Sequence, residues 1–407
     1  MSRRDVLRCA VLAGVGVILA GCRAAIASPS PSASVPAATP SAAPTPSGSA
    51  TASPTPPATT TATPGIALRE RIAGTIVVGF RGSTLDDAAW LRTALAETGL
   101  GGVILFDRDQ ESGGRRNIVS PDQLTTLVSD VRAAAGGRAI VVSVDQEGGV
   151  VTRLSPAHGF PAVASEADIG AAGDVAAARS WGRGIAETLA AVGIDLNLAP
   201  VVDLDVNPTS PAIGALDRSF SADPDVVVAM ANAEIEAHRA AGVRTTLKHF
   251  PGIGSSTANT DFGVADVTDT WDRTELEPFR RLIEAGLADA IMAGHVVNRN
   301  LDPDHPASLS PAIVGDLLRG ELGWDGPVVT DDLQAAAIDE AFGFEEAVVL
   351  ALEAGNDVLL FANQQRYDDR IATRAIDAVV AAVDSGRLSE ARIDEAWGRV
   401  QQLLGVG

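Results

Sequence analysis

The chain has 407 residues, of which 46% are hydrophobic and 20% are charged, a balance typical of a soluble globular protein with a sizeable core. Its formal net charge is −21, although the first 64 residues are net basic, so the acidic excess lies in the remainder. A body this acidic argues against nucleic acid as a partner, because the phosphate backbone would repel it.

The first element of the chain is predicted to be an export signal. Arg3, Arg4 and Arg8 precede an apolar run over positions 9–20, which is too short to span a bilayer permanently. The paired arginines resemble a twin-arginine signal, with a general secretory signal as the alternative. The run ends in the tetrapeptide LAGC, which resembles the bacterial lipobox, with an ordinary cleavage site and an incidental cysteine as the alternative. We therefore expect a lipoprotein signal peptide at 1–21 and lipidation of Cys22, which would anchor the protein to the cell membrane outside the cytoplasm.

The next segment, residues 22–65, is expected to be a disordered linker. Positions 28–64 are almost wholly Ser, Pro, Thr and Ala. Without apolar periodicity and with frequent proline, such a segment builds no core and extends as a semi-rigid spacer. Its predicted role is to hold the folded body, residues 66–407, away from the membrane.

The body alternates short β-branched runs with helical patterns, which is typical of parallel βα units. Eight strands are predicted, at 74–80, 102–106, 139–144, 195–202, 244–249, 290–296, 326–330 and 357–361. Helices are predicted at 85–98, 121–135, 174–192, 223–241, 273–285, 311–322, 344–354, 367–384 and 389–404. This order fits a (β/α)₈ TIM-type barrel of the α/β class, whose usual size is about 250 residues.

The positions of unusual polar residues favour the barrel over the alternative, a doubly wound open sheet. Such residues lie in the last two positions of predicted strands, as at Lys248 and His295, or directly after them, as at Asp145, Asp203 and Asp331. In a barrel the carboxyl ends of all strands meet at one mouth. An open sheet would gather them only near the point where its strand order reverses.

Three of these strand ends are candidate parts of a site. After the strand that ends in IVVSV, a glycine pair allows a tight turn, so that Asp145 and Arg153 could address one ligand. Lys248 and His249 precede a Pro-Gly turn, where a break in the strand would free both for hydroxyl contacts. The residues alone leave other roles open. Asp145 could cap a loop, Arg153 could pair with a surface carboxylate, and His249 could be a structural histidine.

The third strand end carries Asp331 and Asp332. One carboxylate can point into the mouth while the other caps the segment that follows. A carboxylate fixed there is the part required for a covalent sugar intermediate. Two loop aspartates without a catalytic role are the alternative.

Metal and cofactor chemistry is not expected. The chain has no HExxH, CxxC, Walker A or nucleophile-elbow motif, and its histidines show no ligand spacing. Its cysteines, Cys9 and Cys22, both precede the body, which excludes a disulfide, a cysteine ligand and a cysteine nucleophile from it.

Five motifs together resemble glycoside hydrolase family 3, and within it the single-domain bacterial β-N-acetylhexosaminidases that act on peptidoglycan fragments. The resemblance covers most of residues 66–400. In chain order the motifs are DQEGGVVTR from Asp145, LDRSF from Leu216, KHFPGIG from Lys248, AGHVV from Ala293 and TDDL from Thr330.

The resemblance implies a barrel and a retaining hydrolysis without a cofactor, with Asp331 as the nucleophile. It also implies a set of residues that contact the sugar. These are Asp145, Arg153, Arg218, Lys248 and His249.

The chain departs from the family where the general acid is expected. Family members of this type carry a second histidine in KHFPGHG, and here that position is Ile253. Their Asp-Ser-His triplet, whose histidine serves as general acid and base, aligns here with Asn259-Thr260-Asp261. We therefore hypothesise that the carboxyl group of Asp261 replaces the imidazole.

The expected function is that of a monomeric exo-β-N-acetylglucosaminidase that trims terminal β-linked N-acetylhexosamine from cell-wall fragments. Its expected partners are this carbohydrate and, through Cys22, the membrane. Two alternatives are open: another family 3 β-glycosidase or phosphorylase, and a barrel that binds wall glycan without cleaving it.

Overall fold

The computed structural model describes residues 66–406. The predicted signal peptide, Cys22 and the whole of the linker lie outside these residues, so those interpretations stay predictions. Within the described part of the chain, no helix is long and apolar enough to cross a membrane.

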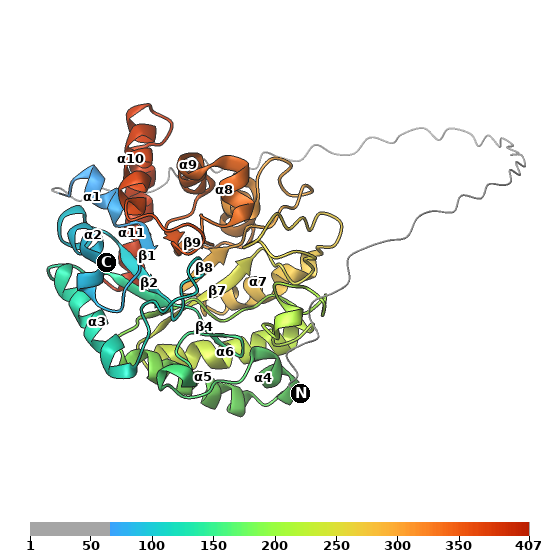
Figure 1. Cartoon of the computed structure of the whole chain (residues 1–407). Helices are drawn as coiled ribbons and strands as arrows, with labels where there is room; N and C mark the ends of the chain where they lie inside the picture. The colour runs from blue at the N-terminus through green and yellow to red at the C-terminus, as the bar shows by residue number, and fades with distance from the viewer. Residues whose placement is uncertain (1–65, 407) are drawn as a thin grey trace, which may run out of the picture. The chain divides into compact units, whose positions relative to one another are not determined.

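The body is an eight-stranded parallel barrel, as predicted (Figure 1). The strands run in the order β10-β1-β2-β3-β6-β7-β8-β9, and a bridge between Val329 and Val358 connects the two ends of this order. Their bounds are β1 (Ile76–Gly79), β2 (Gly102–Leu105), β3 (Val141–Val144), β6 (Leu196–Asn197), β7 (Arg244–Phe250), β8 (Ala290–Ala293), β9 (Val328–Thr330) and β10 (Leu359–Phe361).

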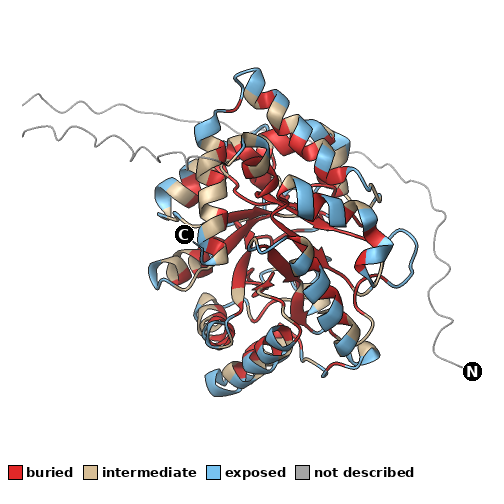
Figure 2. Cartoon of the chain, turned by 90° about the vertical axis from the view of Figure 1, so that its left-hand side faces the viewer, coloured by how far each residue is buried: buried red, intermediate tan, exposed pale blue. Residues whose placement is uncertain are grey.

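Helices surround the strands, and their apolar faces are buried against the barrel (Figures 1 and 2). The α-helices are α1 (Leu68–Ala73), α2 (Ala89–Thr93), α3 (Pro121–Ala134), α4 (Glu166–Ala172), α5 (Val175–Ala191), α6 (Pro224–Ala240), α7 (Glu277–Glu284), α8 (Ala336–Phe342), α9 (Phe344–Ala354), α10 (Ile371–Asp384) and α11 (Glu390–Leu404). The 3₁₀-helices are η1 (Leu85–Ala88), η3 (Pro156–His158), η4 (Gly214–Leu216), η5 (Arg273–Leu276) and η6 (Ala307–Leu309), and the π-helices are η2 (Ala94–Thr98) and η7 (Pro311–Glu321).

Side-chain caps define where several of these helices begin. Ser120, Asp174, Asp223 and Ser389 each accept a hydrogen bond from a backbone N–H in the first turn of α3, α5, α6 and α11. These caps satisfy donors that the helix itself leaves unpaired. The predicted helix starts therefore agree with the structure to within about one residue at these four sites.

The barrel interior is filled by apolar side chains that alternate along the strands. This cluster includes Val77, Ile104, Val141, Met292 and Leu360. Val400 and Leu403 of α11 join the same cluster. Because α11 also contacts the starts of several strands, it closes the barrel at the amino ends of its strands. The opposite end, where the strands finish, is the one left for a site.

The predicted strand at 195–202 is shorter than expected. Only Leu196–Asn197 forms β6, and beyond it Val201 makes a single bridge with Lys248. Pro200 lies between them and has no N–H to continue the ladder. The predicted helix at 85–98 is likewise divided, into η1, α2 and η2.

Candidate active site

A cavity of about 500 Å³ opens at the carboxyl ends of the strands. The structure brings every candidate site residue of the body to its wall. These residues are Asp145, Arg153, Arg218, Lys248, His249, Asp261 and Asp331. Four strands, β3, β6, β7 and β9, and the loops that follow them contribute these side chains, so residues far apart in the sequence share one concave surface.

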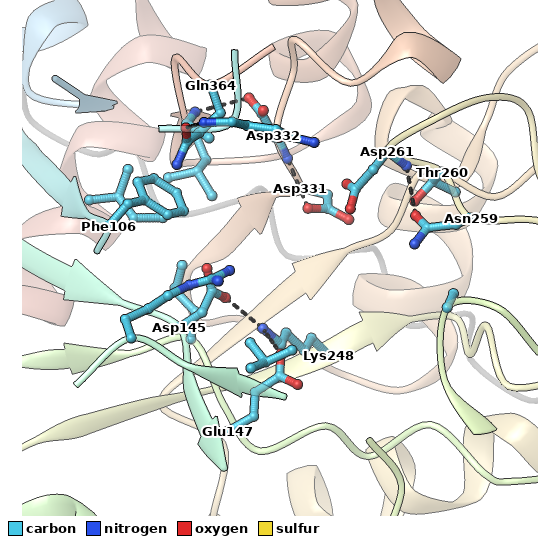
Figure 3. A pocket seen from close by; sticks show the side chains of 18 of the residues that line it. Phe106, Asp145, Glu147, Lys248, Asn259, Thr260, Asp261, Asp331, Asp332 and Gln364 are labelled. Atoms are coloured by element: carbon cyan, nitrogen blue, oxygen red, sulfur yellow. Dashed lines mark hydrogen bonds and ion pairs between the residues drawn. The ribbon is translucent and has the colours of Figure 1, made fainter. Parts of the chain in front are cut away.

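One wall of the cavity is a buried network of ion pairs (Figure 3). The Nζ of Lys248 lies 2.7 Å from Asp145 Oδ1 and 2.7 Å from Glu147 Oε1. Glu147 also binds Arg218 with both oxygens, at 2.7 and 2.8 Å. Two cations and two carboxylates therefore compensate one another in a cluster that holds each side chain in one orientation.

The network keeps its members charged in spite of their burial. Burial alone would raise the pKa of Glu147, but Arg218 and Lys248 lower it well below the usual range of a glutamate. Burial would lower the pKa of Lys248, but Asp145 and Glu147 raise it. The charged side chains of the network are therefore held in place, and they offer hydrogen-bond donors and acceptors to a ligand that carries hydroxyl groups.

Two short strands, β4 (Gln146–Gly148) and β5 (Val151–Thr152), explain how Arg153 reaches the cavity. Gly148 and Gly149 have φ values of 102° and 56° and form the turn between these antiparallel strands, as the glycine pair predicts. Arg153 returns over the cavity with its guanidinium 5.5 Å from the ring centroid of Phe106. Within residues 66–406 no carboxylate forms an ion pair with it, and its side chain lines the cavity.

His249 is held by a fully buried carboxylate. Its Nδ1 lies 2.7 Å from Asp203 Oδ2, and Asp203 also accepts hydrogen bonds from the N–H groups of His249 and Ile253. Nδ1 is thus occupied by Asp203, whereas Nε2 has no hydrogen-bond partner among the described residues and is the ring nitrogen available to a ligand. The peptide bond between Lys248 and His249 is cis, and both side chains line the cavity.

Asp331 and Asp332 follow β9 and both line the cavity. Burial would raise the pKa of Asp331, but His295, His249 and the N–H of Asp332 together lower it below its usual value. Burial raises the pKa of Asp332 to about 7. Its Oδ1 accepts hydrogen bonds from two backbone N–H groups, which offset only part of the effect of burial. The two neighbouring carboxyls therefore have pKa values displaced in opposite directions, with that of Asp331 lowered and that of Asp332 raised.

Asp261 lies at the mouth of the cavity, and its carboxylate faces that of Asp331 (Figure 3). Although the residue as a whole is exposed, its carboxyl is turned toward the cavity wall. Desolvation by the surrounding groups and then the charge of Asp331 raise the pKa of Asp261, and Arg218, His249 and His295 oppose this shift only in part. Two neighbouring carboxyls thus have pKa values displaced in opposite directions, one favouring the ionised form and one the protonated form.

The other histidines in the described chain do not take the position of the missing imidazole. His295 is buried and both ring nitrogens are occupied, Nδ1 by Ser308 Oγ at 2.6 Å and Nε2 by the carbonyl of Asp332 at 2.8 Å. His158 lies 3.6 Å from Asp107, and of this pair only Asp107 lines the cavity. Asp261 is therefore the candidate acid that the geometry supports.

Two functional partners are not evident from the sequence. Glu147 lies inside the DQEGG motif and joins Lys248 to Arg218, and Asp203 orients His249. Asp203 stands out as a polar residue after a predicted strand, but the identity of its partner depends on how β6 and β7 pack. Within the described residues, no group of three or more His, Cys, Asp or Glu side chains is arranged to hold a metal ion.

Comparison with known proteins shows which family the chain is similar to. The model of the family described as "Glycosyl hydrolase family 3 N terminal domain" matches residues 67–403. A beta-hexosaminidase of Tolumonas auensis is 38% identical over 301 residues, which cover 72% of this chain and 84% of that protein.

The chain is also similar to solved structures of β-N-acetylhexosaminidases and β-N-acetylglucosaminidases. A β-N-acetylhexosaminidase from Beutenbergia cavernae superposes with a TM-score of 0.76 at 35% identity, covering 84% of this chain and 99% of the other. A glycoside hydrolase family 3 β-N-acetylglucosaminidase from a Paenibacillus species also has a TM-score of 0.76, at 36% identity, and the match covers 84% of this chain and 63% of that longer one.

Proposed function

The chain belongs to glycosyl hydrolase family 3, and on that premise we propose that it is a retaining exo-β-N-acetylhexosaminidase. The observation that carries the proposal is the pair of facing carboxyls, Asp331 with a lowered pKa and Asp261 with a raised one. The names of the similar proteins, β-hexosaminidases and β-N-acetylglucosaminidases, support terminal β-linked N-acetylglucosamine as the sugar.

The proposed reaction has two steps. In the first, Asp331 attacks the anomeric carbon and forms a glycosyl-enzyme, while Asp261 gives its proton to the leaving oxygen. In the second, Asp261 takes a proton from water, the water oxygen bonds to the anomeric carbon, and Asp331 leaves as a carboxylate. Two displacements at one carbon return the sugar with its original configuration.

The ion-pair wall positions the sugar in this scheme. Asp145 and the Nε2 of His249 accept hydrogen bonds from sugar hydroxyls, while Lys248, Arg153 and Arg218 donate. Because these groups are already fixed to one another, binding orders few side chains and the geometry needed for attack is reached with little entropic cost.

The proposed setting is outside the cytoplasm, where a monomer anchored to the membrane through Cys22 trims fragments of cell-wall glycan. The lipobox-like LAGC sequence and the long Ser, Pro, Thr and Ala segment support the anchor and the reach. The cell-wall substrate rests on the resemblance of the motifs to peptidoglycan-acting members of the family.

Asp331→Ala tests the nucleophile. We expect kcat to fall on the order of 10⁴-fold or more and no glycosyl-enzyme to accumulate, because the attacking group is gone. Mass spectrometry after rapid quenching and hydrolysis of an aryl β-N-acetylglucosaminide would measure this. Asp316→Ala is the matched control, since Asp316 is exposed on η7, and it should retain full activity. Substantial activity in Asp331→Ala would contradict the whole assignment.

A panel of aryl glycosides, assayed with and without phosphate, separates the alternatives. A hydrolase should release the same free sugar in both conditions, whereas a phosphorylase would form a sugar phosphate and speed up when phosphate is added. A binding protein would cleave none of them. Preference for the N-acetylglucosaminide within the panel tests the sugar itself.

A further inference from the structure

Two adjacent glutamines, Gln364 and Gln365, follow β10 and hold the loops on either side of the cavity. The side-chain amide of Gln364 makes two hydrogen bonds to the loop after β2. Its Oε1 accepts from the N–H of Gln110 at 2.8 Å, and its Nε2 donates to the carbonyl of Arg108 at 3.0 Å.

Gln365 holds the opposite loop. Its Nε2 donates to the backbone carbonyl of Asp261 at 3.1 Å. Within residues 66–406 this is the one hydrogen bond that joins the segment 257–264 to another part of the fold, since its other hydrogen bonds are made within the segment or to Ser256. The tip of the segment extends into solvent, with Phe262 70% exposed and Val264 55% exposed.

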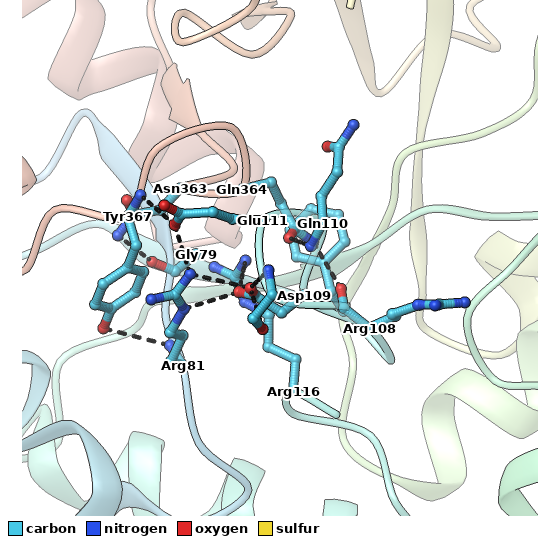
Figure 4. A network of polar contacts seen from close by, with 12 residues as sticks. Gly79, Arg81, Arg108, Asp109, Gln110, Glu111, Arg116, Asn363, Gln364 and Tyr367 are labelled. Carbon is cyan, nitrogen blue, oxygen red and sulfur yellow. Dashed lines mark hydrogen bonds and ion pairs between the residues drawn. The ribbon is translucent and has the colours of Figure 1, made fainter. Parts of the chain in front are cut away.

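The glutamine pair directly follows Asn363, whose side chain is held by several hydrogen bonds (Figure 4). Asn363 is fully buried and has a φ of 54°, a conformation that asparagine adopts more readily than most residues. Its Nδ2 donates to the carbonyls of Gly79 and Asp368, and its Oδ1 accepts from the N–H of Asp368. This stretch of the chain is thereby fixed to β1, so the hydrogen bond of Gln365 connects the solvent-exposed segment to the barrel itself.

We propose that Gln365 is a positioning residue for the proton transfer, which acts by fixing the backbone of Asp261. The inference rests on the proposed function, in which Asp261 is the general acid and base. A hydrogen bond to the carbonyl of a residue fixes the peptide plane next to the Cα from which its side chain projects.

This fixation matters more for an aspartate than it would for a histidine. The carboxyl of Asp261 has a short side chain, so its reach to the leaving oxygen depends on where the backbone lies. Proton transfer requires donor and acceptor within about 3.2 Å, and a displacement of about 1 Å can cost on the order of 100-fold in rate. By holding the backbone of Asp261 in place, Gln365 would keep the short carboxyl side chain close enough to the leaving oxygen to transfer its proton.

Gln365→Met tests the inference, because methionine keeps the length of the side chain and removes the N–H donor. We expect kcat/KM to fall by about 10- to 100-fold on a disaccharide, whose leaving group needs a proton. On a dinitrophenyl glycoside, whose leaving group departs unprotonated, the expected loss is less than about 3-fold. That second rate also shows that the variant is folded and that Asp331 still reacts.

Two further variants complete the experiment. Gln402→Met makes the same chemical change on the exposed surface of α11 and should leave both rates unchanged. Asp261→Asn should show the same selectivity between leaving groups, more strongly, and adding Gln365→Met to it should change neither rate by more than about 2-fold, since the residue to be positioned no longer transfers a proton.

The outcomes separate the inference from the function on which it rests. If Asp261→Asn shows the selectivity and Gln365→Met does not, or if the losses of the two variants multiply in the double variant, the positioning role is overturned while Asp261 keeps its role. If Asp261→Asn slows both substrates equally, the acid assignment itself is wrong and the positioning role falls with it.

Discussion

At the scale of single residues, the central feature is the proposed acid, Asp261, which differs from the histidine that the family motif leads one to expect. A histidine with a pKa near 6.5 can give and take protons at neutral pH without adjustment. A carboxyl can serve as an acid at neutral pH only if its pKa is raised. In the cavity, desolvation and the charge of Asp331 raise the pKa of Asp261. The same surroundings lower the pKa of Asp331, so two identical groups in one site acquire the different pKa values that the two proposed roles require.

The pH dependence of kcat/KM follows from these displacements. Activity should rise with pH as Asp331 ionises, at a pKa below that of an ordinary aspartate, and fall as pH increases through the raised pKa of Asp261. With a poor leaving group, Asp261→Asn should remove the falling limb, whereas Asp269→Asn, an exposed change in the same connection between β7 and β8, should not. A falling limb that persists in Asp261→Asn would exclude Asp261 as the acid.

Asp332 provides a second check on the same profile. Its pKa is raised to about 7 and it lines the same cavity, so its titration can influence the charge felt by its neighbours. Asp332→Asn should shift both limbs of the pH profile of kcat/KM without removing either one. The Oδ1 of Asp332 already accepts hydrogen bonds from the N–H groups of Gln334 and Ala362, so this carboxyl has no role in the proposed proton transfer.

At the scale of structural elements, the loop after β7 determines whether Asp261 reaches the cavity. It leaves β7 through Gly254, where an added Cβ would lie 1.7 Å from the carbonyl oxygen of Leu204. Two backbone segments are therefore in contact at a point where only glycine fits. Further along, Gly263 has no such neighbour, since nothing lies within 4 Å of the place that an added Cβ would take.

Gly254→Ala and Gly263→Ala form a matched pair in this one loop. We expect Gly254→Ala to lower the free energy of unfolding by at least about 3 kcal/mol and to reduce activity, because the backbone of Leu204 would have to move. Gly263→Ala should change the free energy of unfolding by less than about 1 kcal/mol. Urea unfolding of both variants would measure the difference, and equal stabilities would refute this account of the loop.

The sequence predicts the elements of this fold better than their contacts. Hydrophobic runs and capping residues locate the strands and the starts of several helices, because these depend on neighbours along the chain. Pro200 shortens β6 for a local reason that could be read from the sequence. The β4–β5 hairpin, α1 and α4 are too short to leave a clear periodic pattern, so the sequence does not predict them.

At the scale of the whole molecule, the position of polar residues after successive strands is enough to predict a common mouth. It does not predict which side chains are partners there. Glu147, Asp203 and Gln365 come from different loops, and only the closed barrel brings them to Lys248, His249 and Asp261. Motif resemblance supplies the expected roles of the motif positions, but a residue such as Gln365 belongs to no motif and is recognised by its contact alone.

The proposed anchor is also a property of the whole molecule. Cys22→Ala should move the protein from the membrane fraction to the soluble extracytoplasmic fraction, because the acylated residue is removed. Cell fractionation and metabolic labelling with a fatty acid would measure this, with Cys9→Ala as the matched control, since Cys9 lies within the predicted signal peptide. Unchanged membrane association and continued labelling of Cys22→Ala would rule out Cys22 as the anchor.

The two walls of the cavity differ in how their carboxyls are compensated. On one wall Lys248 and Arg218 neutralise Asp145 and Glu147, whereas on the other, in the part of the chain that the structure describes, Asp331, Asp332 and Asp261 gather without a lysine or arginine bound to them. In the proposed reaction the ionised carboxylate of Asp331 would stabilise positive charge at the anomeric centre, where the oxocarbenium character of the transition state develops. We therefore expect a sugar mimic with a protonated ring nitrogen to bind more tightly than its neutral analogue.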